Sequence, residues 1–272
     1  MQYNNELQII DTEQKAYLLG FLFSDGCITK GNTVRISLVD KEIIDKLAIE
    51  FPFFNTGSFD FSIYHKNNKI QYSLVKQNSK LYQDLTNHGL IERKSTENSN
   101  LLILPNLKNE LMNHFIRGYF DGNGSISIPS NRPNLRRIEI CSSSKTFIET
   151  LKNYFESKNI NCPYYREKQN TKSILYVLEW IKNEDIIIFK DFLYKNSTIS
   201  LKRKKEIFDN FVIIDKTDNN PRCPYCNNKS INNGNRKTNY GIALRYECQV
   251  CKKQFTIKSY AELKLDELLE TP

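Results

Sequence analysis

The chain has 272 residues, of which 39% are hydrophobic and 12% aromatic, enough apolar material for one large core or two moderate ones. No stretch approaches the roughly 18 consecutive apolar residues of a membrane span, and the start, MQYNNELQII, has no basic segment ahead of an apolar one, so we expect a cytoplasmic protein that is neither secreted nor membrane-bound. The net charge of +8 arises after residue 104, where 28 basic residues face 19 acidic ones, which favours a polyanionic partner.

The first 104 residues predict an α+β unit. Asp11 followed by Gln14 has the spacing of an N-cap with a capping box, and predicts a helix that runs through KAYLLGFLFS and is closed by Gly26. Residues 33–39 alternate between apolar and polar, as a half-buried strand does. The remaining segments predict a helix over 40–51, paired strands over 58–65 and 70–76, and a helix over 78–89.

The same order recurs over residues 105–214. Pro105 can open a helix, because its fixed φ suits the first helical position. The later segments predict strands over 125–128 and 135–141, a helix over 144–159, strands over 164–169 and 173–181, and helices over 183–195 and 201–211. We therefore expect three domains: repeats at 1–104 and 105–214, and a polar linker with a cysteine-rich module at 215–272.

One motif is written twice. YLLGFLFSDG at 17–26 and FIRGYFDGNG at 115–124 are offset by 98 residues, which pairs Gly20 with Gly118 and Asp25 with Asn123. A glycine inside a helix costs about 1 kcal/mol relative to alanine, and close approach of two backbones would offset that cost. Packing of the two motif helices at Gly20 and Gly118 would bring Asp25 and Asn123 side by side at their C-terminal ends.

A carboxylate is disfavoured at a helix C-terminus, where the backbone carries partial negative charge. A bound divalent cation reverses that interaction, and Mg²⁺ prefers carboxylate, carbonyl and water oxygens. The alternative interpretation is that Asp25-Gly26 and Asn123-Gly124 simply form the turns that start a strand. The duplication of the position favours the metal site.

These paired motifs resemble those of the LAGLIDADG homing endonucleases in their single-chain form. The likeness covers about residues 12–212 and includes GLIERKS and LYKNSTISLKRKKEIF. It implies an α+β fold of two pseudo-twofold-related αββαββα repeats, forming a saddle that straddles double-stranded DNA of about 20 base pairs or longer. It also implies a monomeric, site-specific endonuclease that hydrolyses phosphodiesters with Mg²⁺ or Mn²⁺.

The resemblance also assigns site residues. It implies that Asp25 and Asn123 hold metal with the backbone carbonyls of Ser24 and Gly122, and that Lys94 and Lys204 are the nearby basic catalytic residues. Arg93 and Arg203 remain alternatives to these lysines, and an ordinary solvated lysine is the other interpretation. Asn123 departs from the family, because an amide lacks the charge of a carboxylate, so we expect weaker metal binding at one half-site and strand-biased nicking or slow cleavage. Asp121 cannot replace it, because two residues along a helix turn the side chain by about 200°.

The polar faces of the predicted strands are candidates for DNA contact. Arginine pairs with guanine most commonly, so side chains on a sheet face can read base edges in the major groove. A solvated sheet face is the other interpretation. The candidates are Arg35 and Ser37 in the first repeat and Arg137, Glu139, Arg166 and Lys168 in the second.

Four of the seven cysteines form two C-x2-C pairs separated by 21 residues, the spacing of a Zn²⁺ ribbon. These are Cys223, Cys226, Cys248 and Cys251. Four thiolates close a structural zinc site; a redox role is the alternative. The segment resembles zinc ribbons of transposases, which implies DNA contacts by Arg236, Lys237, Arg245, Lys252 and Lys253. Tyr240, Tyr246 and Phe255 are interleaved with the basic residues; we expect them to form the small ribbon core, with base stacking as the alternative.

The sequence thus predicts a site-specific DNA endonuclease with an added zinc ribbon. The residue at position 123 keeps an alternative open, a cleavage-deficient, sequence-specific DNA-binding regulator. A second alternative is an intron RNA maturase, with RNA as a less favoured partner.

Overall fold

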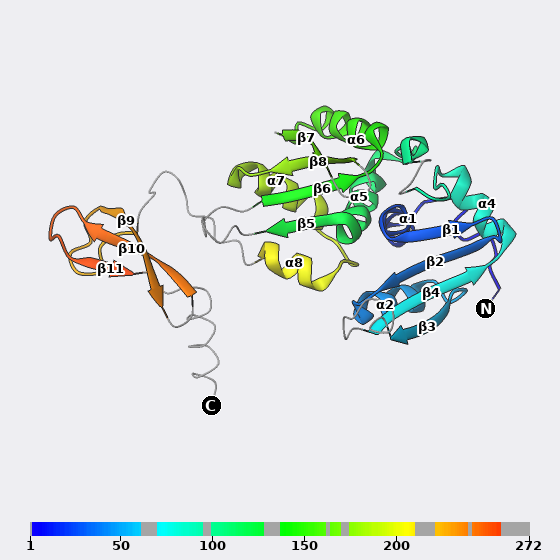
Figure 1. The fold of residues 1–272 in the computed structure, drawn as a ribbon, viewed down its shortest axis with the longest axis horizontal. Helices are drawn as coiled ribbons and strands as arrows, with labels where there is room; N and C mark the ends of the chain where they lie inside the picture. The colour runs from blue at the N-terminus through cyan, green and yellow to red at the C-terminus, as the bar shows by residue number, and fades with distance from the viewer. Residues whose placement is uncertain are drawn as a thin grey trace. The chain divides into compact units, whose positions relative to one another are not determined.

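The computed structural model describes residues 2–60, 70–94, 99–127, 137–161, 164–169, 174–209, 221–238 and 241–256. The chain divides into two compact units, Met1–Phe211 and Val212–Pro272. The first unit contains the first predicted repeat and the second one as far as Phe211 (Figure 1). No helix in the described ranges is long and apolar enough to cross a membrane.

The first repeat builds one antiparallel sheet with helices on one side. Its strands follow the order β1-β2-β4-β3. The elements are α1 (Glu13–Ser24), β1 (Gly26–Thr29), β2 (Thr33–Leu38), α2 (Lys41–Glu50), β3 (Asn55–Asp60), β4 (Ile70–Gln77) and α4 (Ser79–Asn87).

The second repeat follows a short 3₁₀ helix, η1 (Ser99–Leu101), and has the equivalent strand order β5-β6-β8-β7. Its elements are α5 (Asn109–Asn123), β5 (Gly124–Ser127), β6 (Arg137–Ser142), α6 (Lys145–Ser157), β7 (Tyr164–Gln169), β8 (Ile174–Trp180), α7 (Asn183–Tyr194) and α8 (Lys202–Asp209). The predicted α+β class and the αββαββα order of both repeats are confirmed.

Two predicted helix starts are wrong. α1 is capped by Thr12, whose side chain accepts a hydrogen bond from the Lys15 N–H, while Asp11 pairs with the Lys15 ammonium at 2.8 Å. α5 begins only at Asn109, after Lys108, whose ψ of 142° is not helical. Pro105 is buried in the irregular segment before this helix, so its fixed φ serves the connection and not the first turn.

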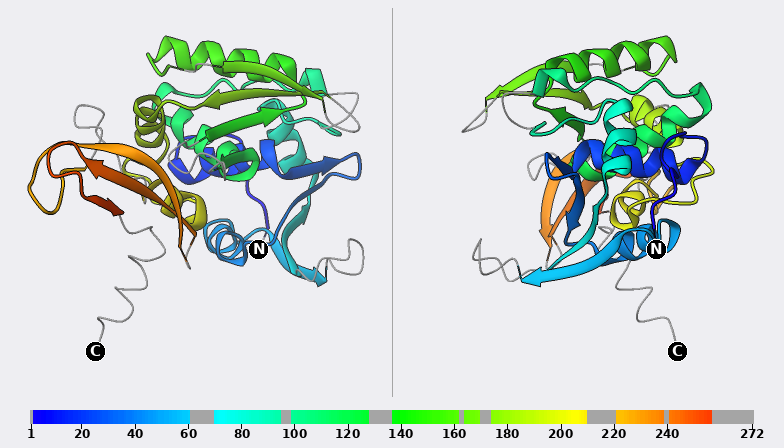
Figure 2. Two further views of the ribbon diagram at one scale, coloured as in Figure 1. Left: turned by 60° about the vertical axis from the view of Figure 1, so that its left-hand side comes forward. Right: turned by 90° about the vertical axis from the view of Figure 1, so that its right-hand side faces the viewer.

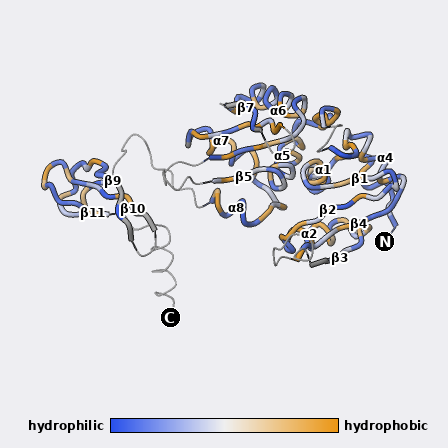
Figure 3. Tube along the Cα trace, viewed as in Figure 1, coloured by the Kyte–Doolittle hydropathy of each residue, from blue (hydrophilic) through white to orange (hydrophobic). Residues whose placement is uncertain are grey.

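Alternation along the strands divides each sheet into two faces. Ile138 and Ile140 of β6 are buried, whereas their neighbours in the strand are partly exposed. In β2 the buried positions are Val34 and Ile36. Figure 2 shows the helices of each repeat against one face of its sheet, and Figure 3 shows hydrophobic and hydrophilic residues alternating along the chain. No helix of the described part of residues 1–211 covers the opposite face of either sheet.

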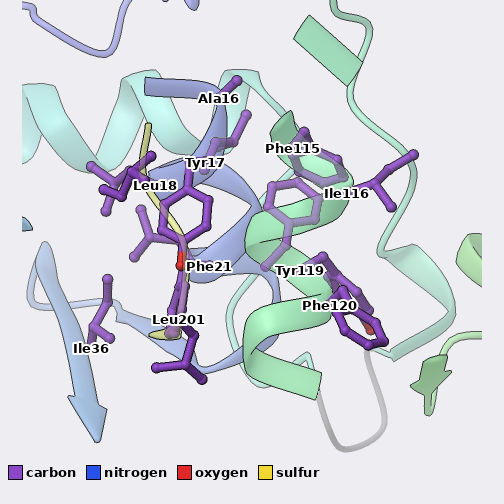
Figure 4. Close-up of a cluster of buried hydrophobic side chains, with 14 of the residues drawn as sticks. Ala16, Tyr17, Leu18, Phe21, Ile36, Phe115, Ile116, Tyr119, Phe120 and Leu201 are labelled. Carbon is purple, nitrogen blue, oxygen red and sulfur yellow. The ribbon is translucent and has the colours of Figure 1, made fainter. Parts of the chain in front are cut away.

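α1 and α5 pack against each other in the middle of the first unit, and both are buried along most of their length. Figure 4 shows side chains of α1, such as Tyr17 and Phe21, beside Phe115 and Tyr119 of α5. The aromatic rings of Phe23 and Phe115 meet edge to face at 5.1 Å. The repeated motif therefore forms the centre of one continuous core.

The second unit contains a small antiparallel sheet of strands β9 (Ser230–Thr238), β10 (Gly241–Cys248) and β11 (Gln254–Thr256), in the order β11-β10-β9. Tyr246 is buried and stacks on Phe255 at 5.8 Å. The predicted linker is described only at residues 221 and 222, and Cys162 and Tyr240 lie outside the described residues.

Candidate functional site

The two motif glycines form a reciprocal backbone contact between α1 and α5. A Cβ at Gly20 would stand 1.9 Å from the Phe115 carbonyl oxygen, and one at Gly118 would stand 2.1 Å from the Tyr17 carbonyl oxygen. Phe115 and Tyr17 are themselves equivalent, since they are 98 residues apart. The seam between the repeats is thus pseudo-symmetric and leaves no room for a side chain at either glycine.

Asp25 directly follows α1 and lies against the end of α5. A Cβ at Gly122 would stand 2.7 Å from Asp25 Oδ2 and 1.9 Å from Ser24 Oγ. The described residues donate no hydrogen bond to this carboxylate, and Asp25 taken as a whole residue is exposed, although its carboxyl group lies close to the ends of both motif helices. Desolvation at the crowded helix ends raises the pKa of Asp25, and the nearby charges of Lys94 and Lys204 oppose this shift.

Asn123 is the last residue of α5, at the position equivalent to Asp25. Its Nδ2 donates a long hydrogen bond of 3.4 Å to the Tyr119 hydroxyl. That contact uses the donor end of the amide, so the amide oxygen is free to accept or to ligate. The side chain is partly exposed.

Lys94 and Lys204 make equivalent contacts with the two motif helices. Lys94 Nζ donates to the carbonyl oxygens of Leu22, at 3.0 Å, and Gly26. Lys204 Nζ donates to the carbonyl oxygens of Phe120 and Gly124, each at 2.6 Å. Leu22 and Phe120 are 98 residues apart, as are Gly26 and Gly124, so the two lysines close the ends of the two motif helices in the same way.

Burial changes the acidity of both lysines. It lowers the pKa of Lys94 to about 8, against the opposing charge of Asp25. It also lowers the pKa of Lys204 to about 8, against Asp121. Arg203 instead contacts Asp40 at 3.0 Å, and Arg93 is exposed with a φ of 50°. The two lysines contact the helix-end carbonyls directly, and the charge of Arg203 also acts on Asp25.

The sequence did not reveal a polar network buried beside the seam. Arg117 is fully buried, contacts Glu13 at 2.5 Å through NH2, and donates to the carbonyls of Ile199 and Leu193 at 2.9 Å each. Its guanidinium lies over the Tyr17 ring, 5.4 Å from the centroid. This network fixes the segment between α7 and α8 to the motif helices.

Asp121 belongs to the same network. Its carboxylate accepts hydrogen bonds from the hydroxyls of Tyr17 at 2.8 Å and Tyr194 at 2.6 Å, and from the Leu201 N–H at 2.7 Å. Burial raises the pKa of Asp121, and these hydrogen bonds oppose the shift. A buried, fully occupied carboxylate cannot reach the end of α5, and its bond to Leu201 anchors the start of α8, which carries Lys204.

The predicted DNA-reading residues lie on the uncovered sheet faces. Arg35 is exposed and Ser37 is partly buried. In the second repeat, Arg137, Glu139 and Arg166 are joined into one ionic network by Glu179 of β8, a residue that was not among the predicted DNA contacts. Lys168 is exposed on the same face at the edge strand.

The four predicted zinc ligands come together in the second unit. All four sulfurs lie within 4.8 Å of one another. Cys223 and Cys251 Sγ are 3.6 Å apart, and Cys226 and Cys248 Sγ are 3.4 Å apart. A tetrahedral zinc ion with Zn–S bonds of about 2.3 Å requires sulfur separations of about 3.8 Å, so the cluster has the right size for zinc.

The two cysteine pairs sit on matching turns. The N–H groups of Tyr225 and Val250 each donate to the first sulfur of their pair at 3.4 Å. The residues after the pairs, Asn227 and Lys252, have positive φ angles of 55° and 60°. Backbone N–H donors pointing at sulfur stabilise a thiolate, which is the protonation state that a metal ligand needs.

The predicted basic residues of the second unit are spread over this sheet and the second turn. Arg236, Lys252 and Lys253 are exposed, and Arg245 Nε donates to the Asn233 carbonyl at 3.1 Å. The Lys253 ammonium lies 4.7 Å from the centroid of the exposed Tyr225 ring. Lys237 pairs with Ile242 in the ladder, but its side chain is outside the described part.

Comparison with known proteins locates the family signal in the second repeat, where residues 110–193 match the model of the LAGLIDADG-like domain. The probable translation initiation factor IF-2 of Methanocaldococcus jannaschii is 27% identical over 215 residues, which are 76% of this chain and 17% of that protein. The chain therefore spans about a sixth of the length of this relative.

Solved structures of LAGLIDADG proteins are also similar to this chain. The homing endonuclease I-WcaI, bound to its DNA recognition sequence, is 17% identical, with 66% of this chain and 80% of that chain covered and a TM-score of 0.45. The N-terminal LAGLIDADG domain of DUF199/WhiA is 16% identical, with 75% and 92% covered and a TM-score of 0.43. I-DmoI in complex with DNA and Mn is 18% identical, with 71% and 99% covered and a TM-score of 0.44.

Proposed function

We propose that this chain is a site-specific, double-strand DNA endonuclease that works as a monomer, with divalent metal at the ends of its two motif helices. The observation that carries the proposal is the meeting of these ends, where Asp25 lies against Gly122 and Lys94 and Lys204 make equivalent contacts. A single pseudo-symmetric site with two basic residues suits two phosphodiesters on opposite strands.

The residues at the helix ends fit a hard divalent cation. Asp25 has a carboxylate without a hydrogen-bond donor among the described residues, and Asn123 has an amide oxygen whose donor end alone is engaged. Mg²⁺ and Mn²⁺ favour such oxygens. Asp25, Asn123 and the carbonyls of Ser24 and Gly122 would hold the cation, which would supply positive charge and an acidified water beside a phosphate. The Gly122 carbonyl is shared, because Lys204 Nζ lies 3.4 Å from it.

The two lysines keep this site in shape. Each ammonium neutralises the carbonyls at the end of its helix, where negative partial charge collects. A lysine whose pKa is lowered to about 8 exchanges its proton readily near neutral pH. Lys94 and Lys204 therefore orient the helix ends and assist charge stabilisation at the bound phosphates.

The uncovered sheet faces of the first unit and the unit Val212–Pro272 would bind the DNA. Arg35, Ser37, Arg137, Arg166 and Lys168 face outward from the two sheets. The four-cysteine cluster would hold one structural zinc ion, and its basic surface would add phosphate contacts through a second, tethered module. This module would lengthen the footprint, so deletion of residues 215–272 should shorten the protected DNA and weaken binding.

A second candidate function is a DNA-binding regulator that does not cleave. The observation that favours it is Asn123, an uncharged ligand at the position where the first repeat has Asp25. The buried Asp121 offers no replacement, because three hydrogen bonds occupy its carboxylate. In that case the same surfaces bind a duplex, and the helix ends hold no catalytic metal.

Cleavage of a randomised duplex library distinguishes these functions. The protein is incubated with the library and Mg²⁺ or Mn²⁺, and the new ends on both strands are sequenced. Defined ends that disappear in Asp25→Asn, but persist in the matched control Asp45→Asn on the exposed face of α2, support the endonuclease. Enrichment of one sequence by binding without any cut supports the regulator, and an absence of both overturns the proposal.

A further inference from the structure

Two carboxylates face each other on the uncovered side of the second sheet. Glu139 of β6 and Glu179 of β8 are directly opposite in the antiparallel register. Like charges in this arrangement destabilise a sheet unless a cation joins them. The Glu179 side chain is only 8% exposed, so its charge also loses much of its hydration.

Two arginines compensate this pair. Arg137 Nε lies 2.6 Å from Glu179 Oε1, and Arg166 Nε lies 3.3 Å from Glu179 Oε2. Arg166 NH2 also contacts Glu139 Oε1 directly. One buried carboxylate therefore holds two guanidinium groups, and it reaches both through the Nε side.

In this geometry part of each arginine side chain remains exposed to solvent. The Arg137 and Arg166 side chains are 40% and 35% exposed, so they lie above the carboxylate. No described residue accepts a hydrogen bond from the terminal nitrogens of Arg137. Arg137 Nε, Arg166 Nε and Glu179 Oε1 are buried without a hydrogen bond among the described residues, so the contacts of Glu179 with the two Nε atoms are purely ionic. Arg166 pairs with Val177 in the neighbouring strand, and Val177 is buried on this face. The aliphatic part of the Arg166 side chain is therefore packed, in addition to the ion-paired guanidinium. Both arginines are thus fixed with donors available for a ligand above the sheet.

The fold itself does not require the acidic pair. Gly26 pairs with Ile36 in the first repeat, as Gly124 pairs with Ile140 in the second, which makes Arg35 equivalent to Glu139. Arg35 is opposite Val75, the equivalent of Glu179. The first repeat builds the same ladder without an acid at either position, so the carboxylates of the second repeat serve something other than sheet formation.

From these observations we infer that Glu179, with Glu139, is a specificity-determining positioning residue of the second half-site, an inference that rests on the proposed DNA-binding function. The two carboxylates orient Arg137 and Arg166 so that the exposed part of each guanidinium meets base edges, with guanine as the favoured base. Their negative charge also opposes loose attachment of the arginines to phosphates at unrelated sequences. The two carboxylates therefore increase the ratio of the non-specific to the specific dissociation constant.

The test starts with selection of a binding site from a randomised duplex pool by the native full-length chain, without divalent metal. Failure of the native chain to enrich any sequence overturns the proposed function together with this inference. Once a site is selected, dissociation constants for that duplex and for a scrambled duplex are measured by fluorescence anisotropy at several salt concentrations. The variants are Glu179→Gln, Glu139→Gln and a matched control, Glu149→Gln, which pairs with Lys145 on the exposed face of α6.

For Glu179→Gln we expect the ratio of non-specific to specific dissociation constants to fall by about tenfold or more, largely because the scrambled duplex binds more tightly. Repeated selection with this variant should also return a site with relaxed bases in one half only. Glu149→Gln removes the same charge and should shift both constants by one common factor. The inference is overturned if Glu179→Gln does the same.

Thermal unfolding of each variant shows whether a change in binding results from loss of the folded structure. If Glu179→Gln does not fold, Glu139→Gln decides the matter, because it keeps the buried Glu179 carboxylate and removes the negative charge that Arg166 NH2 contacts. A fall of about threefold or more in the binding ratio for that variant supports the inference. An unchanged ratio overturns it.

Discussion

Gly118 of α5 lies against the carbonyl oxygen of Tyr17 in α1, at a separation that would leave a Cβ only 2.1 Å away. The atoms of α1 nearest to an added Cβ at Gly118 are all backbone atoms of Tyr17 and Phe21. Backbone atoms cannot change rotamer to make room, as a side chain could. We therefore expect Gly118→Ala to force the helices apart and to lower the free energy of unfolding by about 3 kcal/mol or more. Chemical denaturation measures the change.

Gly31→Ala is the matched control for this substitution. Gly31 lies in the turn between β1 and β2, and its nearest contact for an added Cβ would be 3.8 Å away. We expect a change within about 0.5 kcal/mol there. Equal stability of the two variants would contradict the close-packed seam.

Glu13→Gln should destabilise the chain by about 3 kcal/mol, because it leaves the buried guanidinium of Arg117 without a counter-ion. Glu42→Gln, which breaks an exposed pair with Lys46, should cost no more than about 0.5 kcal/mol. Urea denaturation at pH 7 compares the two. A loss for Glu13→Gln no larger than that for Glu42→Gln would exclude a stabilising role for the buried pair.

The same carboxylate makes stability depend on pH. Burial alone would raise the pKa of Glu13, but the Thr198 N–H and the Arg117 charge outweigh it and hold the pKa below its ordinary value. A carboxyl group with a lowered pKa in the folded state stabilises the fold above its unfolded pKa of about 4.3, and this contribution disappears as the pH falls through the folded value. Between pH 5 and 3, roughly, the native chain should therefore lose more stability than Glu13→Gln does. Parallel curves would contradict the assignment.

Lys204→Met should reduce stability by about 2 kcal/mol while keeping most of the packed stem. The Lys204 ammonium donates to several carbonyls at the end of α5, and charged hydrogen bonds contribute about 1.5 to 3 kcal/mol each when buried partners are lost. Lys202→Met, in the same helix with a side chain 65% exposed, is the control and should be nearly neutral. Thermal unfolding compares the pair.

Asn123→Asp should speed cleavage of the strand that the native protein cuts slowly. A carboxylate restores the charge that the second half-site lacks, and charge is the larger part of the affinity of an oxygen site for Mg²⁺ or Mn²⁺. The measurement is the ratio of nicked to linear product from a plasmid with the selected site, with Asn123→Ala as the opposite control. An unchanged ratio in Asn123→Asp would show that the residue does not limit the second cut.

Removal of zinc should unfold only the residues of the unit Val212–Pro272. The cysteine cluster lies wholly within that unit, and the small sheet around it has few buried side chains. We expect one zinc ion per chain in the native protein and none in Cys248→Ser, with Cys27→Ser as the control because Cys27 is exposed in β1. Metal analysis and amide hydrogen exchange of the two units provide the readouts. Uptake of zinc by Cys248→Ser to the native level would refute the site.

Much of the fold is readable from the sequence because the repeated motif and the strand alternation are local patterns. The motif gives both central helices, and period-two alternation gives β2 and β6 nearly to the residue. Helix starts are less certain from sequence, because Asp11 and Thr12 are both good capping residues, and the structure uses the side chain of Thr12 as the cap. The spacing of the cysteines similarly anticipates their assembly into one cluster.

The Arg117 network and Glu179 could not be found so directly. Arg117 stands in an apolar helix, and its partners come from α1 and from residues about 80 positions further along, which no local pattern reveals. Glu179 did carry a signal. Alternation in β8 places it on the face opposite Leu178 and Trp180, beside residues already expected to contact DNA.

The salt bridge between Glu13 and Arg117 also decides which halves recognise each other. The glycine seam is self-complementary, so each repeat could in principle pair with a second copy of itself. At the equivalent positions, however, the first repeat has Leu19 in place of Arg117, and the second has Leu111 in place of Glu13. Two copies of either repeat would bury one sign of charge with no opposite charge to meet it. Both charges are neutralised only when the first repeat pairs with the second. This ion pair therefore favours pairing of the two different repeats over pairing of two identical ones.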